Sequence, residues 1–404
     1  MNRNTNTCTR QTVVKLLIVE LLFWQCSALF SYFSVYFQSL GLSASETGNI
    51  TGLNSVIGVV AIPMWGLLSD KIGSTKKVLI LTLIGTAALY WLIPVVSNSQ
   101  RITLLVAIVV IISSIFRSPL STLVDNIVIR SSNKWGLNYG FLRAVGSIGS
   151  AVTSILLGIV IPIIGIEKTF TFVPLIILPL LGVVIITKDE RDVTEGNETK
   201  SDPDIRAVYK NYAFITFLVF NLLVSIATQS IMTFSPYLMA DIGVDGSKIG
   251  IVFGWQGIIQ IFILLLLKNL REKFALYKML IAAGFLYTIV CFSYAMVQSL
   301  ASILFFATFA GMASGLLIAC CNNYIFEIAE SELVTTYQGF MYSVILLAGI
   351  FGNVAGGKLI DDINIRNFYK VLSLLVFSGT LLYVLSFKIK KVKSNKGENK
   401  NVAK

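Results

Sequence analysis

Long apolar segments, each followed by a polar loop, run through the whole chain. About 20 consecutive apolar residues are enough for an α-helix to cross the hydrocarbon core of a bilayer. The pattern therefore predicts an all-α polytopic membrane protein with twelve transmembrane helices in two six-helix halves. The expected spans are 14–38, 46–68, 77–97, 102–129, 137–162, 168–187, 210–237, 247–267, 275–297, 300–326, 335–358 and 366–388.

A polar segment at 188–209 lies between the sixth and seventh predicted spans. It is rich in charged residues and has no apolar periodicity, which is typical of a flexible linker. We expect it to lie in the cytoplasm and to separate an N-terminal six-helix half, 1–187, from a C-terminal six-helix half, 210–404, which ends in a short basic tail. Two six-helix halves around a central site are the architecture of many secondary transporters.

Composition and charge agree with this pattern. Hydrophobic residues make up 55% of the chain and charged residues only 13%, whereas a soluble domain carries about a quarter charged residues. The net charge of +11 arises from Lys and Arg in loops on one side of the predicted spans, as the positive-inside rule requires. The excess of positive charge therefore does not indicate nucleic-acid binding. We predict a multi-pass protein of the cell membrane with both termini in the cytoplasm.

Groups used in catalysis and metal binding are scarce. The chain has no histidine, which excludes histidine-based catalysis and any histidine proton relay. Its five cysteines have no metal-ligand or disulfide spacing, and no catalytic dyad is visible. We therefore expect no enzyme activity, catalytic residue, metal or cofactor. The expected partners are a small solute, protons and the lipid bilayer, and the chain is expected to be a monomer.

Charged side chains interrupt the apolar sequence of the fourth and fifth predicted spans. Asp125 lies five residues before Arg130, where the loop begins, and Arg143 lies six residues after Leu137, where apolar sequence resumes. Because the two helices run antiparallel, both charges are expected roughly 8–9 Å inside the same membrane face. Ionisable residues inside a span mark functional sites by default. Asp125 and Arg143 are thus predicted to bind substrate, with Arg117 deeper in the cavity; a structural ion pair is the alternative.

Glu20, about six residues into the first span, is expected at roughly the depth of Asp125. A buried carboxyl group beside a second carboxylate and a guanidinium can carry a proton, so Glu20 and Asp125 are the candidates for proton coupling. The alternative for Glu20 is snorkelling to the membrane interface, and Glu327 is a weaker candidate. Neutral residues at mid-membrane depth are expected to line the cavity or to hold helices together: Gln25, Asn54, Asn221, Gln229, Gln256, Gln260, Asn322, Asn323, Asn353, Trp24, Tyr32 and Trp255.

The loop after the second span reads GLLSDKIGSTKK, at 66–77. Its glycines permit a tight turn and close backbone approach, and its aspartate can accept hydrogen bonds at a helix end. The loop resembles the signature that the major facilitator superfamily carries between its second and third spans, which implies that it stabilises one conformation of the transporter. The matching residues in the predicted site are Gly66, Ser69, Asp70, Lys71, Gly73 and Lys77.

Further segments resemble the oligosaccharide:proton symporter branch of that superfamily, to which lactose permease belongs. They are SETGNI before the second span, GLLSDKIG after it, and YGFLRAVGSIG at the start of the fifth. In that branch a carboxylate on the fourth span and an arginine on the fifth hold the sugar. The resemblance places Asp125 and Arg143 at those positions, where charge would strengthen hydrogen bonds to sugar hydroxyls.

The chain also departs from this branch. The aromatic residue that stacks on the sugar is replaced by Ser150, and the charged coupling residues correspond to Gly257, Val290, Ala310 and Ala313, none of which can ionise. The resemblance therefore leaves galactoside specificity and the coupling mechanism open, and a uniporter is an alternative to a proton symporter.

The predicted function is secondary transport of a small polar solute, such as a sugar, oligosaccharide or glycoside, in symport with protons. Drug or metabolite efflux by antiport is a second hypothesis, although Gly149, Gly158 and Pro162 of the fifth span do not form the glycine–proline signature of the superfamily's drug antiporters. A nucleoside carrier is a third, because nucleosides also present a hydroxylated ring. A substrate-sensing receptor on the same scaffold would need longer cytoplasmic extensions.

Overall fold

The computed structural model describes residues 3–96, 102–137, 139–187, 210–329 and 333–401, so the predicted linker at 188–209 lies outside the described residues. Twelve helical segments of the described chain are long and apolar enough to cross a membrane, which confirms the predicted fold class. The helices are α1 (Arg3–Phe30), α2 (Phe33–Ser39), α3 (Ala44–Ile72), α4 (Thr75–Val96), α5 (Ile102–Arg117), α6 (Leu120–Trp135), α7 (Tyr139–Ile164), α8 (Ile166–Thr169), α9 (Phe172–Ile186), α11 (Tyr212–Asp241), the 3-10 helix η2 (Gly246–Lys248), α12 (Ile249–Lys273), α13 (Leu276–Tyr294), α14 (Leu300–Ile328), α15 (Val334–Ile363) and α16 (Ile365–Asn401).

Two spans that the sequence pattern treats as continuous are divided in the structure. The fourth span consists of α5 and α6, which are separated by Ser118 and Pro119. Proline has no backbone N–H and disfavours a helical conformation of the residue before it, so a helix commonly ends at this point. The first span consists of α1 and α2, separated by Ser31 and Tyr32; the sequence has no proline there, and the break has no comparable signal.

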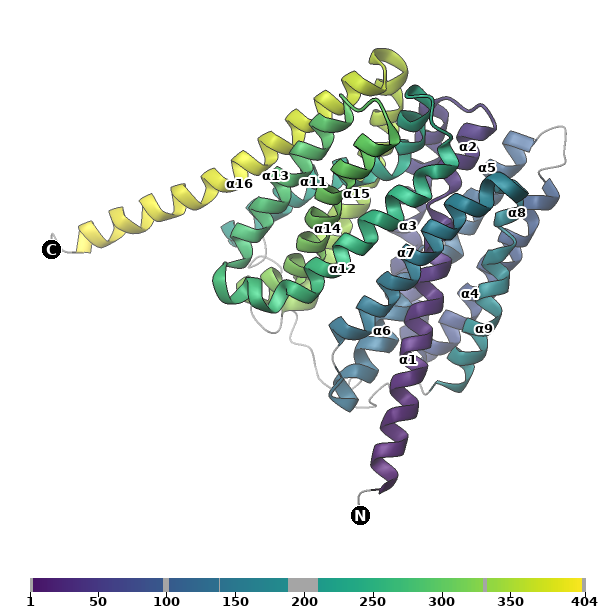
Figure 1. The fold of residues 1–404 in the computed structure, drawn as a ribbon. Coiled ribbons are helices and arrows are strands. Elements are labelled where there is room, and N and C mark those ends of the chain that lie inside the picture. The colour runs from purple at the N-terminus through teal and green to yellow at the C-terminus, as the bar shows by residue number, and fades with distance from the viewer. Residues whose placement is uncertain (1–2, 97–101, 138, 188–209, 330–332, 402–404) are drawn as a thin grey trace.

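The helices form two halves, α1–α9 and α11–α16, which lean together at one end of the molecule (Figure 1). We call this end the closed face; it carries α2 and α8. The halves join mainly through two helix pairs, α3 with α15 and α7 with α12. Toward the opposite end, the terminal face, the two groups of helices separate (Figure 1). The described helices are therefore packed together at one end of the molecule and apart at the other.

Glycines allow the backbones of the two halves to touch at the closed face. A side chain at Gly48 of α3 would overlap the carbonyl oxygen of Asn353 on α15, and one at Gly250 of α12 would overlap the carbonyl oxygen of Ser154 on α7. Small residues at helix crossings are the usual means of close packing in lipid. Both helix pairs therefore depend on glycine at their crossing points.

Hydrogen bonds add to this contact. The hydroxyl groups of Thr47 on α3 and Tyr237 on α11 are 2.6 Å apart. The amide nitrogen of Ser45, at the N-terminus of α3, donates to Asp361 Oδ2 on α15 at 3.0 Å. A carboxylate is favourable at a helix N-terminus because it complements the helix dipole. These bonds therefore link the two halves at the closed face.

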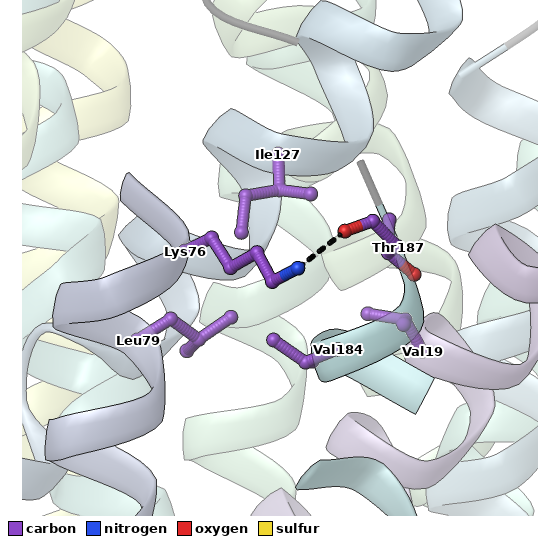
Figure 2. A pocket seen from close by; sticks show the side chains of 6 residues that line it. All are labelled: Val19, Lys76, Leu79, Ile127, Val184 and Thr187. Atoms are coloured by element: carbon purple, nitrogen blue, oxygen red, sulfur yellow. Dashed lines mark hydrogen bonds between the residues drawn. The ribbon is translucent and has the colours of Figure 1, made fainter. Parts of the chain in front are cut away.

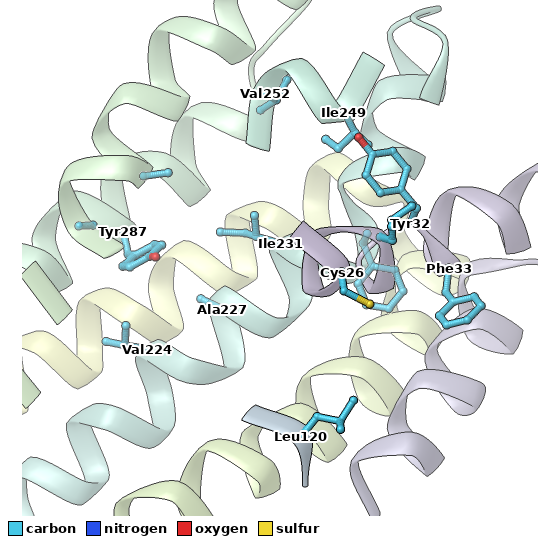
Figure 3. Close-up of a cluster of buried hydrophobic side chains, with 14 of the residues drawn as sticks. Cys26, Tyr32, Phe33, Leu120, Val224, Ala227, Ile231, Ile249, Val252 and Tyr287 are labelled. Atoms are coloured by element: carbon cyan, nitrogen blue, oxygen red, sulfur yellow. The ribbon is translucent and has the colours of Figure 1, made fainter. Parts of the chain in front are cut away.

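Apolar side chains of both halves fill the space behind these contacts (Figure 3). Tyr32 of the first span lies near Ile249 at the start of α12, and both side chains are almost completely buried. The Tyr32 hydroxyl also donates to the carbonyl oxygen of Ser154 at 3.0 Å. Dense packing of this kind leaves little room for water, so the core seals the closed face.

The signature loop forms the turn between α3 and α4. Gly73 ends α3 with a positive φ of 70°, and its amide donates to the carbonyl oxygen of Asp70; glycine adopts this left-handed conformation without steric cost. The next basic residue, Lys76, binds within the N-terminal half. Its Nζ donates to the carbonyl oxygen of Thr187 at the end of α9 (Figure 2) and also to that of Ile185. In this state the loop therefore stabilises the end of the N-terminal half.

We expect the Lys76→Met substitution to lower the stability of the protein by about 2 kcal/mol, because it removes charge-assisted hydrogen bonds to free carbonyl groups at a helix end. The measurement is the apparent melting temperature of the detergent-purified protein. Lys77→Met is the matched control, since the Lys77 side chain is exposed on the same helix. Equal melting temperatures for the two variants would show that the contact with α9 adds no stability.

Candidate functional site

Arg143 lies near the start of α7 and is held by neighbours on two helices. Its guanidinium carbon is 3.6 Å from the centroid of the Trp24 ring on α1, and its Nη1 donates to Ser147 Oγ at 3.1 Å. A guanidinium over the face of a tryptophan is a favourable cation–π arrangement. Gly146 permits it, because a side chain at that position would overlap the Trp24 ring.

Glu20 lies one turn before Trp24 on α1 and is completely buried. Its carboxylate faces the same turn of α7, since Oε2 is 2.9 Å from the position that a Cβ of Gly146 would occupy. Arg143 and Asp125 are the charged groups within electrostatic reach of this carboxylate. Neither oxygen of Glu20 has a hydrogen-bond partner of ordinary geometry among the described residues, and the Trp24 side chain is the donor nearby. The side chain thus does not snorkel to the interface but points into the helix bundle.

The structure brings Glu20, Asp125 and Arg143 together from three helices, as the depths along the predicted spans suggest. Asp125, on α6, and Arg143 are both within electrostatic reach of Tyr342 on α15. Tyr342 is 52% exposed and belongs to the C-terminal half. Proximity between residues so far apart in the chain has no local sequence signal, so the sequence pattern does not identify Tyr342. Direct pairing of Asp125 with Arg143 stays a prediction.

Arg117 occupies a different place, at the end of α5 where the fourth span breaks. Its guanidinium carbon lies 5.4 Å from the ring centroid of Phe30 and 5.9 Å from that of Phe33. These two rings flank the break in the first span. The two helix breaks therefore meet at Arg117, and the buried Tyr90 of α4 is also within its electrostatic reach.

Several neutral polar residues hold helices together. Ser114 Oγ donates to Asn54 Oδ1 at 2.6 Å, joining α5 to α3, and Ser314 Oγ donates to Gln260 Oε1 at 3.2 Å, joining α14 to α12. Trp255 Nε1 donates to Thr308 Oγ1 at 3.0 Å, and its ring lines an apolar groove between α7, α12 and α14. These contacts agree with the expectation that such residues hold helices together.

Four residues correspond to the charged coupling residues of the oligosaccharide:proton symporter branch. They are apolar, and they are packed inside the protein. Val290, Ala310 and Ala313 are at most 1% exposed in the C-terminal half. Gly257 packs against Ala151 of α7, where a Cβ would lie 3.0 Å from the Ala151 Cβ. The group of charged residues around Glu20 belongs entirely to the N-terminal half.

Known proteins were compared with the chain and its fold. Maltose permease of Geobacillus stearothermophilus is 24% identical over 379 residues, covering 93% of this chain and 94% of the permease. The multidrug resistance protein MdtG of Enterobacter lignolyticus is 19% identical over 373 residues, covering 90% and 88%. Among solved structures, that of the nucleoside transporter NupG superimposes with a TM-score of 0.76 at 14% identity, covering 93% of this chain and 99% of that one.

The family comparison covers nearly the whole chain. The model of the MFS_1-like family matches residues 15–371, which includes both helix breaks and every charged residue of the candidate site. The relatives and the solved structures of similar fold are transporters, not enzymes. The chain belongs to the MFS_1-like family and is a transporter of the major facilitator superfamily.

Proposed function

We propose that the protein is a secondary active transporter that moves a small hydroxylated solute, such as a sugar or glycoside, together with protons. The observation that carries this proposal is the group formed by Glu20, Trp24 and Arg143. It combines a buried carboxyl group without hydrogen-bond partners of ordinary geometry among the described residues, a fixed cation and an aromatic ring inside a membrane span. Buried ionisable groups of this kind mark ion and substrate pathways. The similarity to a maltose permease supports a sugar as the solute.

In this proposal Arg143 and Asp125 bind the hydroxyl groups of the solute, and Glu20 carries the proton. Charged partners make stronger hydrogen bonds to hydroxyl groups than neutral partners do. Glu20 is placed for coupling because its charge acts on the same guanidinium that would bind the solute. A ligand shifts a conformational equilibrium only through its different affinities for the two states. Protonation of Glu20 would supply such a difference by changing the charge beside Arg143.

We further propose that both termini are cytoplasmic, since the basic loops lie on the terminal face. The state described here is then closed to the exterior and separates toward the cytoplasm. The 188–209 segment would connect the two halves on that side. Transport would require the α3–α15 and α7–α12 contacts to open while the terminal face closes.

The first test is transport by the purified protein in proteoliposomes, with a panel of mono- and disaccharides and nucleosides, with and without an imposed proton gradient. We expect accumulation of a sugar only when the gradient is present. Equilibration without accumulation would identify a uniporter or another coupling ion. Accumulation of a nucleoside instead of a sugar would show that the solute is a nucleoside and would still support coupling to protons.

Efflux by proton antiport is the second candidate, favoured by the similarity to a multidrug resistance protein along most of the chain. It predicts that lipophilic cations, such as ethidium, leave intact cells faster when the protein is produced. The sugar proposal predicts no such change. Faster ethidium efflux combined with no movement of any sugar would establish efflux and contradict symport.

We expect Arg143→Lys to reduce the initial rate of uptake at least about 10-fold, although the charge is retained. A lysine cannot present the flat fork of donors that reaches Ser147 while covering the Trp24 ring. The measurement is initial uptake at matched protein levels in the membrane. Arg271→Lys is the matched control, because Arg271 forms an exposed ion pair with Glu327. A rate near that of wild type in Arg143→Lys would count against this site.

A further inference from the structure

Arg117 is a cation inside a membrane span for which the described part of the protein provides no counter-ion. Its contacts are the ring faces of Phe30 and Phe33 and the side chain of Tyr90. The ion pairs seen elsewhere, such as Arg271–Glu327 and Arg366–Asp241, lie at exposed positions. A charged side chain inside a span ordinarily faces a water-filled space or an opposite charge. Arg117 is only partly buried, so the residue is not fully enclosed by the packed core.

A second polar group points to the same place. Tyr90 of α4 is completely buried, and its hydroxyl has no hydrogen-bond partner among the described residues that meets ordinary geometry. Arg117 is the charged residue that acts on this hydroxyl and lies near enough to donate to its oxygen; because a guanidinium has no acceptor, the hydroxyl hydrogen is still without one. Buried hydroxyl groups are nearly always hydrogen-bonded in native structures. The unused donor beside this guanidinium thus marks a position suited to a hydrogen-bond acceptor.

The backbone adds to the positive potential at this point. Arg117 is followed by Ser118, Pro119 and the N-terminus of α6, a helix that runs from Leu120 to Trp135. The N-terminus of a helix carries partial positive charge and free N–H groups. Half-helix N-termini at the breaks of transporter helices are known to face anionic groups of substrates. The break in the fourth span therefore reinforces the charge of Arg117.

The rings of Phe30 and Phe33 limit how this cation can be approached. They face the guanidinium carbon, at 5.4 and 5.9 Å, and so cover the guanidinium with apolar surface that cannot accept hydrogen bonds. The N–H donors of a guanidinium lie in its plane and form a flat fork that matches a carboxylate in two parallel hydrogen bonds. A neutral hydroxyl group would leave the charge uncompensated.

We propose that Arg117 and Tyr90 form a binding subsite for a carboxylate group of the substrate, and that the transported solute is an acidic sugar such as a uronic acid or its glycoside. This proposal rests on the proposed function, since Asp125 and Arg143 bind the hydroxylated part of the same molecule. The carboxylate accepts hydrogen bonds from the Arg117 guanidinium and the Tyr90 hydroxyl. It supplies the negative charge that the described residues do not place beside Arg117.

The test compares two probes that differ only at this group, methyl β-D-glucuronide and methyl β-D-glucoside. Binding of each to the full-length protein in nanodiscs is measured by isothermal titration calorimetry. Hydrogen bonds to charged groups contribute about 1.5–3 kcal/mol, which corresponds to about 10- to 150-fold in affinity. We expect wild type to prefer the glucuronide by this factor and Arg117→Gln to lose the preference, with its affinity for the glucoside changed less than about 3-fold.

Two further variants keep the result interpretable. Tyr90→Phe removes only the hydroxyl group, and we expect it to weaken glucuronide binding about 3- to 10-fold without affecting the glucoside. Arg366→Gln removes an arginine at an exposed position of the C-terminal half and should preserve the preference for the glucuronide. If Arg117→Gln does not fold, the proposal is tested by Tyr90→Phe alone. Unchanged glucuronide binding by Tyr90→Phe would then overturn it.

The outcomes separate this proposal from the broader one. Binding of both probes with equal affinity by wild type would overturn the carboxylate subsite and leave the sugar transporter standing. An unchanged preference for the glucuronide in Arg117→Gln would also overturn it, since another residue would then bind the carboxylate. Failure of wild type to bind either sugar, together with transport of a non-sugar solute, would overturn the proposed function itself.

Discussion

Replacing Glu20 by glutamine should abolish accumulation of the solute against its gradient while leaving exchange of internal for external solute close to the wild-type rate. Glutamine has nearly the same shape but cannot bind or release a proton. Glu20 is completely buried, and its oxygens have no hydrogen-bond partner of ordinary geometry among the described residues. The neighbouring donor is the Trp24 side chain, and the side-chain oxygen of glutamine can still accept from it. The energy that couples the proton to the solute is lost, whereas the residues that bind the solute remain.

The two activities are measured separately in proteoliposomes, as uptake driven by an imposed proton gradient and as counterflow at equal pH on both sides. Glu327→Gln serves as the control, because that carboxylate is 51% exposed and paired with Arg271 at the end of α14; it should retain both activities. The role of Asp125 is tested in the same way with Asp125→Asn. Gradient-driven accumulation that survives in both Glu20→Gln and Asp125→Asn would end the hypothesis that these carboxylates couple transport to protons.

The charged site follows only in part from the sequence. Helical rise converts the position of a residue in a span into its depth, which is why Glu20, Asp125 and Arg143 are expected at one level and lie near one another in the structure. Depth does not reveal the direction in which a side chain points around the helix. The position of Arg143 over Trp24 depends on that direction and on the close approach of α1 and α7 at Gly146.

The fold shows the same division. Twelve spans follow from the apolar segments, because lipid requires each crossing segment to satisfy its own backbone hydrogen bonds. The break at Pro119 has a visible cause in the sequence, although the segments on both sides of it are together long and apolar enough to be read as one span. The break at Ser31 has none, and which face of the molecule is closed depends on contacts between helices that are hundreds of residues apart, such as α3 with α15.

The second large effect concerns this closed face. Replacing Gly48 by valine should shift the protein toward the state in which the closed face is open, and should slow uptake strongly. A side chain at position 48 would overlap the carbonyl oxygen of Asn353, which belongs to the backbone of α15 and cannot turn aside. Overpacking of a tight contact costs about 1–3 kcal/mol, which shifts the equilibrium between the two states about 5- to 150-fold.

The state is read from the reaction of a membrane-impermeant maleimide with a cysteine placed at Thr47 in a background without the native cysteines. Thr47 is completely buried at the closed face, where it contacts Tyr237, so its labelling rate reports the fraction of open molecules.

Gly339→Ala is the matched control, because a Cβ at that glycine of α15 meets no atom within 4 Å, and it should leave the labelling rate unchanged. The Gly48→Val variant should unfold no more readily than the control, since the collision exists only when the halves meet. Faster labelling at unchanged stability would therefore mean that glycine is needed at this crossing to close the face, whereas unchanged labelling would show that the two helices can close around a larger side chain.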